Sequence, residues 1–181
     1  MQNARVIHNL ALVGFMGTGK SSVGRLAAQE LGFEFLDTDE LIEERSGRRI
    51  TDIFAQQGED VFRQLESQLV AELANHRDLV ISTGGGLVMN PANLASLKTH
   101  ALVVCLWASP EVIWQRTRHQ SHRPLLQAPD PLAKIRELLT AREAAYRQAD
   151  VLLNTEMRSA REVTQQVLHQ FRAARAQSAG L

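Results

Sequence analysis

The sequence predicts an α/β fold, a three-layer α/β/α sandwich in which helices cover both faces of a five-stranded parallel sheet. Short apolar segments alternate along the chain with longer segments of helical periodicity, and parallel strands need such crossover helices between them. The segment at 101–106 is continuously apolar, as expected for a strand buried on both faces. A glycine-rich string at 14–21 separates the first apolar segment from the first helical one, at the edge of the sheet where ligands bind.

Each expected strand is a short apolar run bounded by turn residues. The strands are expected at 6–13, 33–36, 79–82, 101–106 and 151–154. The helical segments show apolar residues three and four positions apart, on one face. They are expected at 20–31, 38–44, 51–57, 59–75, 130–149 and from 159 onward, with short helices after 90 and after 109.

Capping residues mark where several of these helices begin. Asn90, Ser109 and Asp130 each precede a proline, which favours the first helical position. The segment 159–162 has the sequence of a capping box. The Thr-Asp pair at 51–52 offers a cap for the helix that begins there.

The composition is that of an ordinary globular protein. The 181 residues suit a single domain over 1–181, and 20 basic against 20 acidic side chains leave no net charge, so no nucleic-acid partner is expected. No apolar run approaches the roughly 18 residues of a membrane span, which predicts no membrane partner. Cys105 is the single cysteine and is expected to be buried and inert. We expect a cytoplasmic monomer, without a signal peptide or a spare apolar stripe, and a frayed tail at 173–181.

The string from Gly14 to Ser21 matches G-x-x-x-x-G-K-[ST], the phosphate-binding P-loop. Its glycines let backbone N–H groups turn toward phosphate oxygens, and the following helix N-terminus adds partial positive charge. Lys20 is expected to contact the β- and γ-phosphates, and Ser21 to ligate Mg²⁺. The predicted cofactor is therefore a nucleoside triphosphate, and we expect it to be ATP. The expected nucleotide-binding residues of the loop are Gly17, Thr18, Gly19, Lys20, Ser21 and Ser22.

Two carboxylates, Asp37 and Asp39, lie two residues apart where the second strand meets a helix. One could hold Mg²⁺ through water while the other accepts a proton from an attacking hydroxyl. The alternative is helix capping, because Asp and Thr are favoured directly before a helix. The third strand does not end in an aspartate, so Ser21, Asp37 and water are the expected metal ligands.

Three further regions have features of a substrate site. The segment 82–86 ends a strand with two hydroxyls and three glycines, which let a bound molecule approach the backbone; the alternative is a flexible turn. The run at 115–126 holds three arginines and no acid, which suits a flap over phosphates; the alternative is a solvated basic loop. Arg63 and Arg142 lie among apolar neighbours on helices, where periodicity alone favours ordinary surface arginines.

The ordered set of motifs resembles that of the shikimate kinase family over roughly residues 5–172. The motifs are G-F-M-G-T-G-K-S-S, L-D-T-D, D-I-F-A-x-x-G-E-x-x-F-R-x-x-E, S-T-G-G-G, R-P-L-L and R-E-x-x-Y, which begin at Gly14, Leu36, Asp52, Ser82, Arg123 and Arg142. The resemblance implies a P-loop NTPase fold of the nucleoside monophosphate kinase type, with sheet order 2-3-1-4-5. It also implies ATP-dependent phosphorylation of the 3-hydroxyl of shikimate, giving shikimate 3-phosphate and ADP on the route to chorismate and aromatic amino acids.

The resemblance implies an acceptor-binding region at about 38–66 and assigns roles to residues of the motifs inside and outside it. Asp39 would bind the hydroxyls of shikimate and act as, or substitute for, the base. Asp37 would help to organise Mg²⁺. Arg63 and Arg142 would clamp the carboxylate of shikimate. The three glycines Gly84, Gly85 and Gly86 would line the acceptor pocket.

On the nucleotide side, the resemblance places Arg123 in a lid at about 115–126, where it would reach the phosphates. Arg116 would stack near adenine. Arg158 would lie at an adenine-side position; the family often has a proline two residues later, where this chain has Ala160. Another small-molecule kinase of the same fold, such as a gluconate kinase, and a non-catalytic nucleotide-binding switch stay open as alternatives. The expected catalytic residues are Asp39, Lys20 and Arg123.

Overall fold

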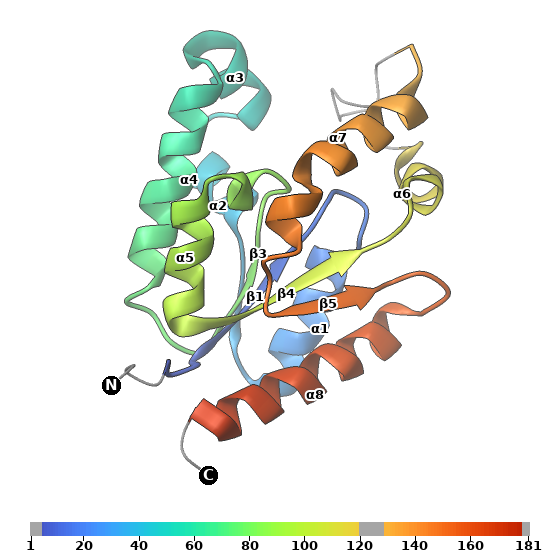
Figure 1. Ribbon diagram of the computed structural model, residues 1–181. Coiled ribbons are helices and arrows are strands. Elements are labelled where there is room, and N and C mark those ends of the chain that lie inside the picture. Colours follow the sequence, from blue (N-terminus) through green and yellow to red (C-terminus); the bar gives the residue numbers. More distant parts are fainter. Residues whose placement is uncertain (1–4, 120–128, 179–181) are drawn as a thin grey trace.

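The computed structural model describes residues 5–119 and 129–178. Its centre is a five-stranded sheet with parallel pairing throughout and the strand order β2-β3-β1-β4-β5, which confirms the predicted fold and strand order (Figure 1). The strands are β1 (Asn9–Val13), β2 (Glu34–Asp37), β3 (Leu79–Ser82), β4 (Ala101–Trp107) and β5 (Val151–Asn154).

Helices connect successive strands and form a layer on each face of the sheet (Figure 1). One layer contains α1 and α8, and the other contains α4, α5 and α7. The helices are α1 (Lys20–Leu31), α2 (Thr38–Ser46), α3 (Ile50–Gln57), α4 (Glu59–Leu73), the 3-10 helix η1 (Leu87–Met89), α5 (Pro91–His100), α6 (Pro110–Thr117), α7 (Pro131–Tyr146) and α8 (Ala160–Ser178). None of the helices in the described segments is both long enough and apolar enough to cross a membrane.

The two layers bury separate hydrophobic cores on opposite faces of the sheet. In β1, Ala11 and Val13 belong to the core under α4 and α5, whereas Leu10 and Leu12 belong to the core under α1 and α8. This alternation follows from the period of two along a strand. It explains why the central strands have apolar side chains on both faces.

The ends of the chain depart from the sequence prediction. The first strand begins at Asn9 and not at Val6, because the Ile7 N–H donates to Ser178 Oγ of α8 and Val6 is exposed. The predicted fraying from 173 is wrong for residues 173–178, which are the last turns of α8. Phe171 is buried there, packed edge-on against the Phe33 ring, and anchors this end of the helix.

The predicted capping side chains form hydrogen bonds at three helices and form none at two. Asn90 and Asp130 accept hydrogen bonds from N–H groups of the first turns of α5 and α7, and the capping box at 159–162 forms as predicted. Ser109 is the N-cap of α6 with Pro110 at the start of the helix, as predicted, but its side chain makes no capping hydrogen bond. Neither residue of the pair 51–52 caps α3, because this helix begins one residue earlier and the Ile50 N–H donates to Glu43 Oε1 of α2.

Candidate active site

The phosphate loop joins β1 to α1 and requires glycine at specific positions. Gly14, Gly17 and Gly19 have φ angles of 132°, 73° and 97°, in a region that L side chains rarely adopt. A Cβ on Gly17 would lie 2.6 Å from Thr117 Cγ2 of α6. The loop therefore holds its shape because its backbone is packed closely against the end of another helix.

Lys20 is the first residue of α1 and its side chain folds back along the loop. Its Nζ donates to Phe15 O at 2.9 Å, and the buried Thr18 Oγ1 donates to the same carbonyl at 2.8 Å. These bonds hold the loop around a cavity of about 500 Å³. The predicted nucleotide-binding residues of the loop that line this cavity are Gly17, Gly19, Lys20, Ser21 and Ser22; Thr18 does not line it.

Three side-chain oxygens lie close together beside the start of α1. Ser21 Oγ donates to Asp37 Oδ2 at 3.0 Å and lies 3.4 Å from Ser82 Oγ. Asp37 also caps α2, because its other oxygen accepts from the Asp39 N–H at 3.1 Å. Asp37 therefore caps a helix and also contacts the Ser21 hydroxyl, so the two interpretations of this side chain do not exclude each other.

Asp39 lies in the first turn of α2, at the junction between two cavities. One is the cavity beside the phosphate loop. The second, of about 620 Å³, is bounded by α2, α3, α4 and residues 84–86, which we call the glycine segment. Asp39, Met16 and Gly85 line both. A Cβ on Gly84 would collide with Asp39 Oδ1, so glycine is required for the carboxylate to lie here.

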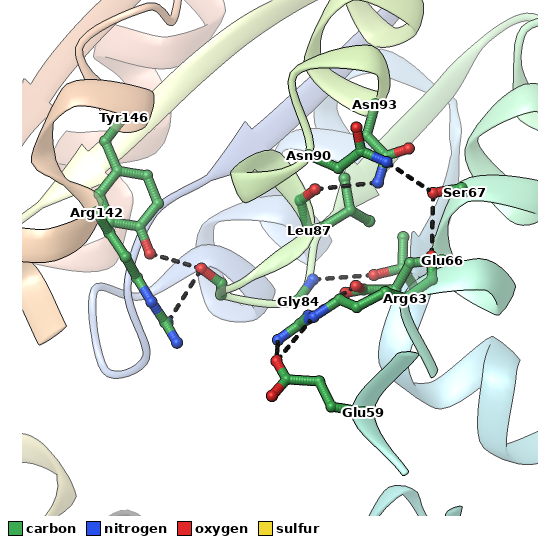
Figure 2. A network of polar contacts seen from close by, with 12 residues as sticks. Glu59, Arg63, Glu66, Ser67, Gly84, Leu87, Asn90, Asn93, Arg142 and Tyr146 are labelled. Carbon is green, nitrogen blue, oxygen red and sulfur yellow. Dashed lines mark hydrogen bonds and ion pairs between the residues drawn. The ribbon is translucent and has the colours of Figure 1, made fainter. Parts of the chain in front are cut away.

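Arg63 of α4 lies against the same glycine segment, between two carboxylates (Figure 2). Its Nη1 donates to Glu66 Oε2 at 2.7 Å, and its Nε and Nη2 donate to Glu59 Oε1 at 3.1 and 2.7 Å. A Cβ on Gly86 would lie 2.6 Å from Arg63 Nη1. Burial raises the pKa of the Glu66 carboxyl above its usual range, against the lowering effect of Arg63, and the nearby Asp39 carboxylate raises it further.

Arg142 approaches the glycine segment from the opposite side, on α7 (Figure 2). Its Nη1 donates to Gly85 O at 3.3 Å, and the Tyr146 hydroxyl, one turn later, donates to the same carbonyl at 2.6 Å. Burial raises the pKa of Tyr146 to about 12, so this hydroxyl stays a hydrogen-bond donor. The glycine segment is thus held between two guanidinium groups that belong to helices far apart in the sequence, and both line the second cavity.

Arg116 lines the cavity beside the phosphate loop, which we also call the nucleotide-side cavity. The interpretation of 115–126 as one flap is wrong for residues 115–117. These residues belong to α6. Arg116 donates to Gly17 O at 3.3 Å and to Thr155 Oγ1 and O at 2.9 and 2.7 Å, which joins α6 to the phosphate loop and to the end of β5.

Of the two other predicted nucleotide-side arginines, the structure describes only Arg158. Arg158 is exposed, donates to Asn154 O and does not line the nucleotide-side cavity. Arg123 lies outside the described residues. Their assigned roles stay predictions.

Sequence reasoning gave no role to several residues that the fold brings to the site. Glu66 is buried at the wall of the second cavity, and its i,i+3 spacing from Arg63 within the F-R-x-x-E motif is the signal that could have identified it. Tyr146 belongs to the R-E-x-x-Y motif, which is the corresponding signal for its contact with Gly85 O. Ser82, one of the two hydroxyl residues at the end of β3, lines the cavity beside the phosphate loop. Phe54 also lines the second cavity and belongs to the D-I-F-A motif, whereas Arg49 lies outside every motif.

Comparisons with known proteins agree with this geometry. A family model described as "Shikimate kinase" matches residues 16–172. The shikimate kinase of Thiobacillus denitrificans is 47% identical over 157 residues, covering 86% of this chain and 86% of that protein. The shikimate kinase of Thermodesulfovibrio yellowstonii is 41% identical over 163 residues, covering 90% and 94%.

Solved structures give the same family. The shikimate kinase from Acinetobacter baumannii, in complex with shikimate, has a TM-score of 0.87 at 39% identity, covering 93% of this chain and 95% of that one. A gluconokinase from Sinorhizobium meliloti has a TM-score of 0.61 at 18% identity, which shows the shared fold alone. The motif order, the two joined cavities and these similarities lead to one conclusion: the chain belongs to the shikimate kinase family.

Proposed function

We propose that this chain transfers the γ-phosphoryl group of ATP to the 3-hydroxyl of shikimate, giving shikimate 3-phosphate and ADP. The observation that supports it best is the junction of the two cavities at Asp39. One cavity has the lining of a phosphate site and the other has two arginines suited to a carboxylate. An acceptor that carries both a carboxylate and hydroxyls, as shikimate does, would lie in the second with a hydroxyl near Asp39.

The two arginines would bind the carboxylate of the acceptor. Arg63 uses three N–H groups in its bonds to Glu59 and Glu66, which leaves two of its five donors for a ligand. Glu66 and Glu59 hold the guanidinium in one orientation, so less side-chain entropy is lost on binding. Arg142, fixed by Gly85 O, would bind the same group from the other side.

The reaction would proceed by attack of the acceptor hydroxyl oxygen on the γ-phosphorus. The bond between this phosphorus and the β–γ bridging oxygen breaks, and ADP leaves with its electron pair. The hydroxyl proton would pass to the Asp39 carboxylate, or to solvent if Asp39 only orients the hydroxyl. Lys20, at the cavity wall, would stabilise negative charge on the β- and γ-phosphates, and Arg123 would add to this effect.

Mg²⁺ fits the convergent oxygens of Ser21 and Asp37, because this ion prefers hard oxygen ligands and keeps several waters. When bound, it would neutralise charge on the phosphates. The described residues contain no cluster of three acidic, histidine or cysteine side chains that could hold a metal, so water would complete its shell. Arg116 would lie on the adenine side. A single domain, a monomeric state and a cytoplasmic location remain predictions from the sequence.

The test is a coupled assay of ADP release with ATP and Mg²⁺, with shikimate or gluconate as acceptor. We expect release that depends on shikimate, is absent with gluconate and is lost in the Lys20→Ala variant. ATP binding without shikimate-dependent turnover would remove the acceptor assignment and leave the phosphate loop. Turnover with gluconate alone would assign the arginine pair to a different acid.

A further inference from the structure

A further cavity, which we call the basic cavity, lies at the end of the sheet opposite the proposed active site. It has a volume of about 690 Å³, within the usual range for small-molecule sites. Its walls are the segments that directly precede β1, β3 and β4, so it lies at the amino ends of the three central strands. β1 has five residues at about 3.3 Å each, which separates this cavity from the phosphate loop by roughly 16 Å.

The lining of this cavity is strongly basic. Its side chains include Arg5, His8, His76, Arg77, Lys98 and His100, and none of the described residues that line it is acidic. Arg5 and Lys98 share one carboxylate, Asp150, at 2.7 and 3.4 Å. Three permanent positive charges therefore face one negative charge, a surplus of two, in a protein whose formal net charge is zero.

Nearby carboxylates do not compensate this surplus. Asp78, next to Arg77, is paired with Arg175 at 3.7 Å, and Glu72 is paired with Arg45 at 2.6 Å. Arg77 is exposed, and no hydrogen bond or ion pair of its side chain is found within 5–119 and 129–178. Its guanidinium is available to a ligand.

His100 supplies a neutral donor in the wall. Asn9 Oδ1 accepts from the Leu79 N–H at 3.0 Å, so Asn9 Nδ2 is a donor, and it lies 2.8 Å from His100 Nδ1. Nδ1 is therefore the acceptor and the proton of the neutral ring is on Nε2. His100 is 5% exposed, and its Nε2 has no hydrogen-bond partner among the residues described. A buried donor without a partner is energetically unfavourable unless a ligand or water supplies the acceptor.

We propose that this cavity binds a small multivalent oxyanion, a phosphate monoester or a polycarboxylate, through the charges of Arg77 and Lys98 and the His100 Nε2–H donor. Guanidinium, ammonium and imidazole N–H groups are the donors that such oxyanions require. The proposal is independent of the phosphoryl-transfer activity. The competing explanation is that Lys98 and His100 only neutralise the carboxyl ends of α4 and α5, which end beside this cavity.

Histidine ring signals in NMR test the proposal directly, because three of the six histidines line the cavity. Burial lowers the pKa of His100, and Arg5 and His8 lower it further, while Lys98, His76, Arg77 and Asp150 are the other charged or titratable groups around it. A bound anion would oppose the effect of the cations. Inorganic phosphate and citrate serve as the two probes, with chloride at equal ionic strength as the reference.

We expect a saturable shift of the His8, His76 and His100 signals and a rise in the pKa of His100. Whichever of phosphate and citrate binds with the lower Kd identifies the class of anion, a phosphate monoester or a polycarboxylate. Arg77→Gln should weaken binding about tenfold or more, whereas Arg172→Gln, an exposed arginine on α8, should leave it unchanged. The same shifts in a Lys20→Ala background would exclude binding at the phosphate loop as their cause. Shifts reproduced by chloride, or unaffected by Arg77→Gln, would overturn the proposal in favour of helix-end neutralisation.

Discussion

Replacing Gly86 with alanine tests whether the glycine segment positions Arg63. Gly86 has a φ of −103°, which alanine adopts readily, so the chain should fold normally. The new Cβ would lie 2.6, 2.7 and 2.9 Å from Arg63 Nη1, Nη2 and Cζ. Ordinary contacts between such atoms are about 3.5–4.0 Å, so the guanidinium must move by about 1 Å.

A displacement of about 1 Å in a positioning group can reduce activity by about 100-fold. Charge-assisted hydrogen bonds of about 1.5–3 kcal/mol correspond to about 10- to 150-fold in binding. We therefore expect Gly86→Ala to raise the KM for shikimate by about 10- to 100-fold and to leave the KM for ATP nearly unchanged, because Arg63 does not line the nucleotide-side cavity.

Steady-state kinetics of a double-mutant cycle with Arg63→Ala separates this mechanism from a simple blockage of the cavity. If the methyl group acts by displacing the guanidinium, it has little further effect once the guanidinium is removed. An unchanged KM for shikimate in Gly86→Ala would refute the reasoning. An effect of full size in the Arg63→Ala background would show that the methyl group blocks the cavity by itself.

Three further predictions follow from the same geometry. Asp39→Asn should lower kcat by at least about 100-fold if Asp39 is the base, and near-normal turnover would make it an orienting group. Tyr146→Phe removes the 2.6 Å bond to Gly85 O and should reduce stability to urea by about 1 kcal/mol, with no loss if water replaces the hydroxyl. Folding lowers the pKa of His100 below its ordinary value of 6.5. As the pH drops through 6.5, the unfolded chain therefore binds more protons than the folded chain, and the free energy of unfolding should decrease. Urea unfolding across pH should show this loss diminished in His100→Gln, and an equal loss in that variant would assign it to other groups.

Local sequence patterns predicted much of the fold and, within the site, the phosphate loop. The strand at 101–106 and the phosphate loop are contiguous segments whose residues act on their own neighbours, and both are found as predicted, β4 being one residue longer. The cap of α3 could not be read in this way, because Glu43 of another helix supplies it. The end of α8 was misjudged for the same reason, since Phe33 and Ile7 stabilise it from elsewhere in the chain.

The site shows the same division. Helical periodicity favoured surface positions for Arg63 and Arg142, and only the resemblance to a family gave them a shared purpose. The tertiary structure places both guanidinium groups against one glycine segment, with Glu66 buried beside Arg63. No pattern within α4 or α7 encodes the contact of these two guanidinium groups with the glycine segment.

The sequence by itself determined where the strands and helices form and which loop can hold phosphate, because hydrophobic period, capping and glycine φ act over a few residues. Only the tertiary structure decided that Asp39 joins two cavities and that Asn9 contacts His100, 91 residues away, in the wall of the basic cavity. Contacts of this length depend on how the sheet and its two helical layers pack, and that packing is a property of the whole chain.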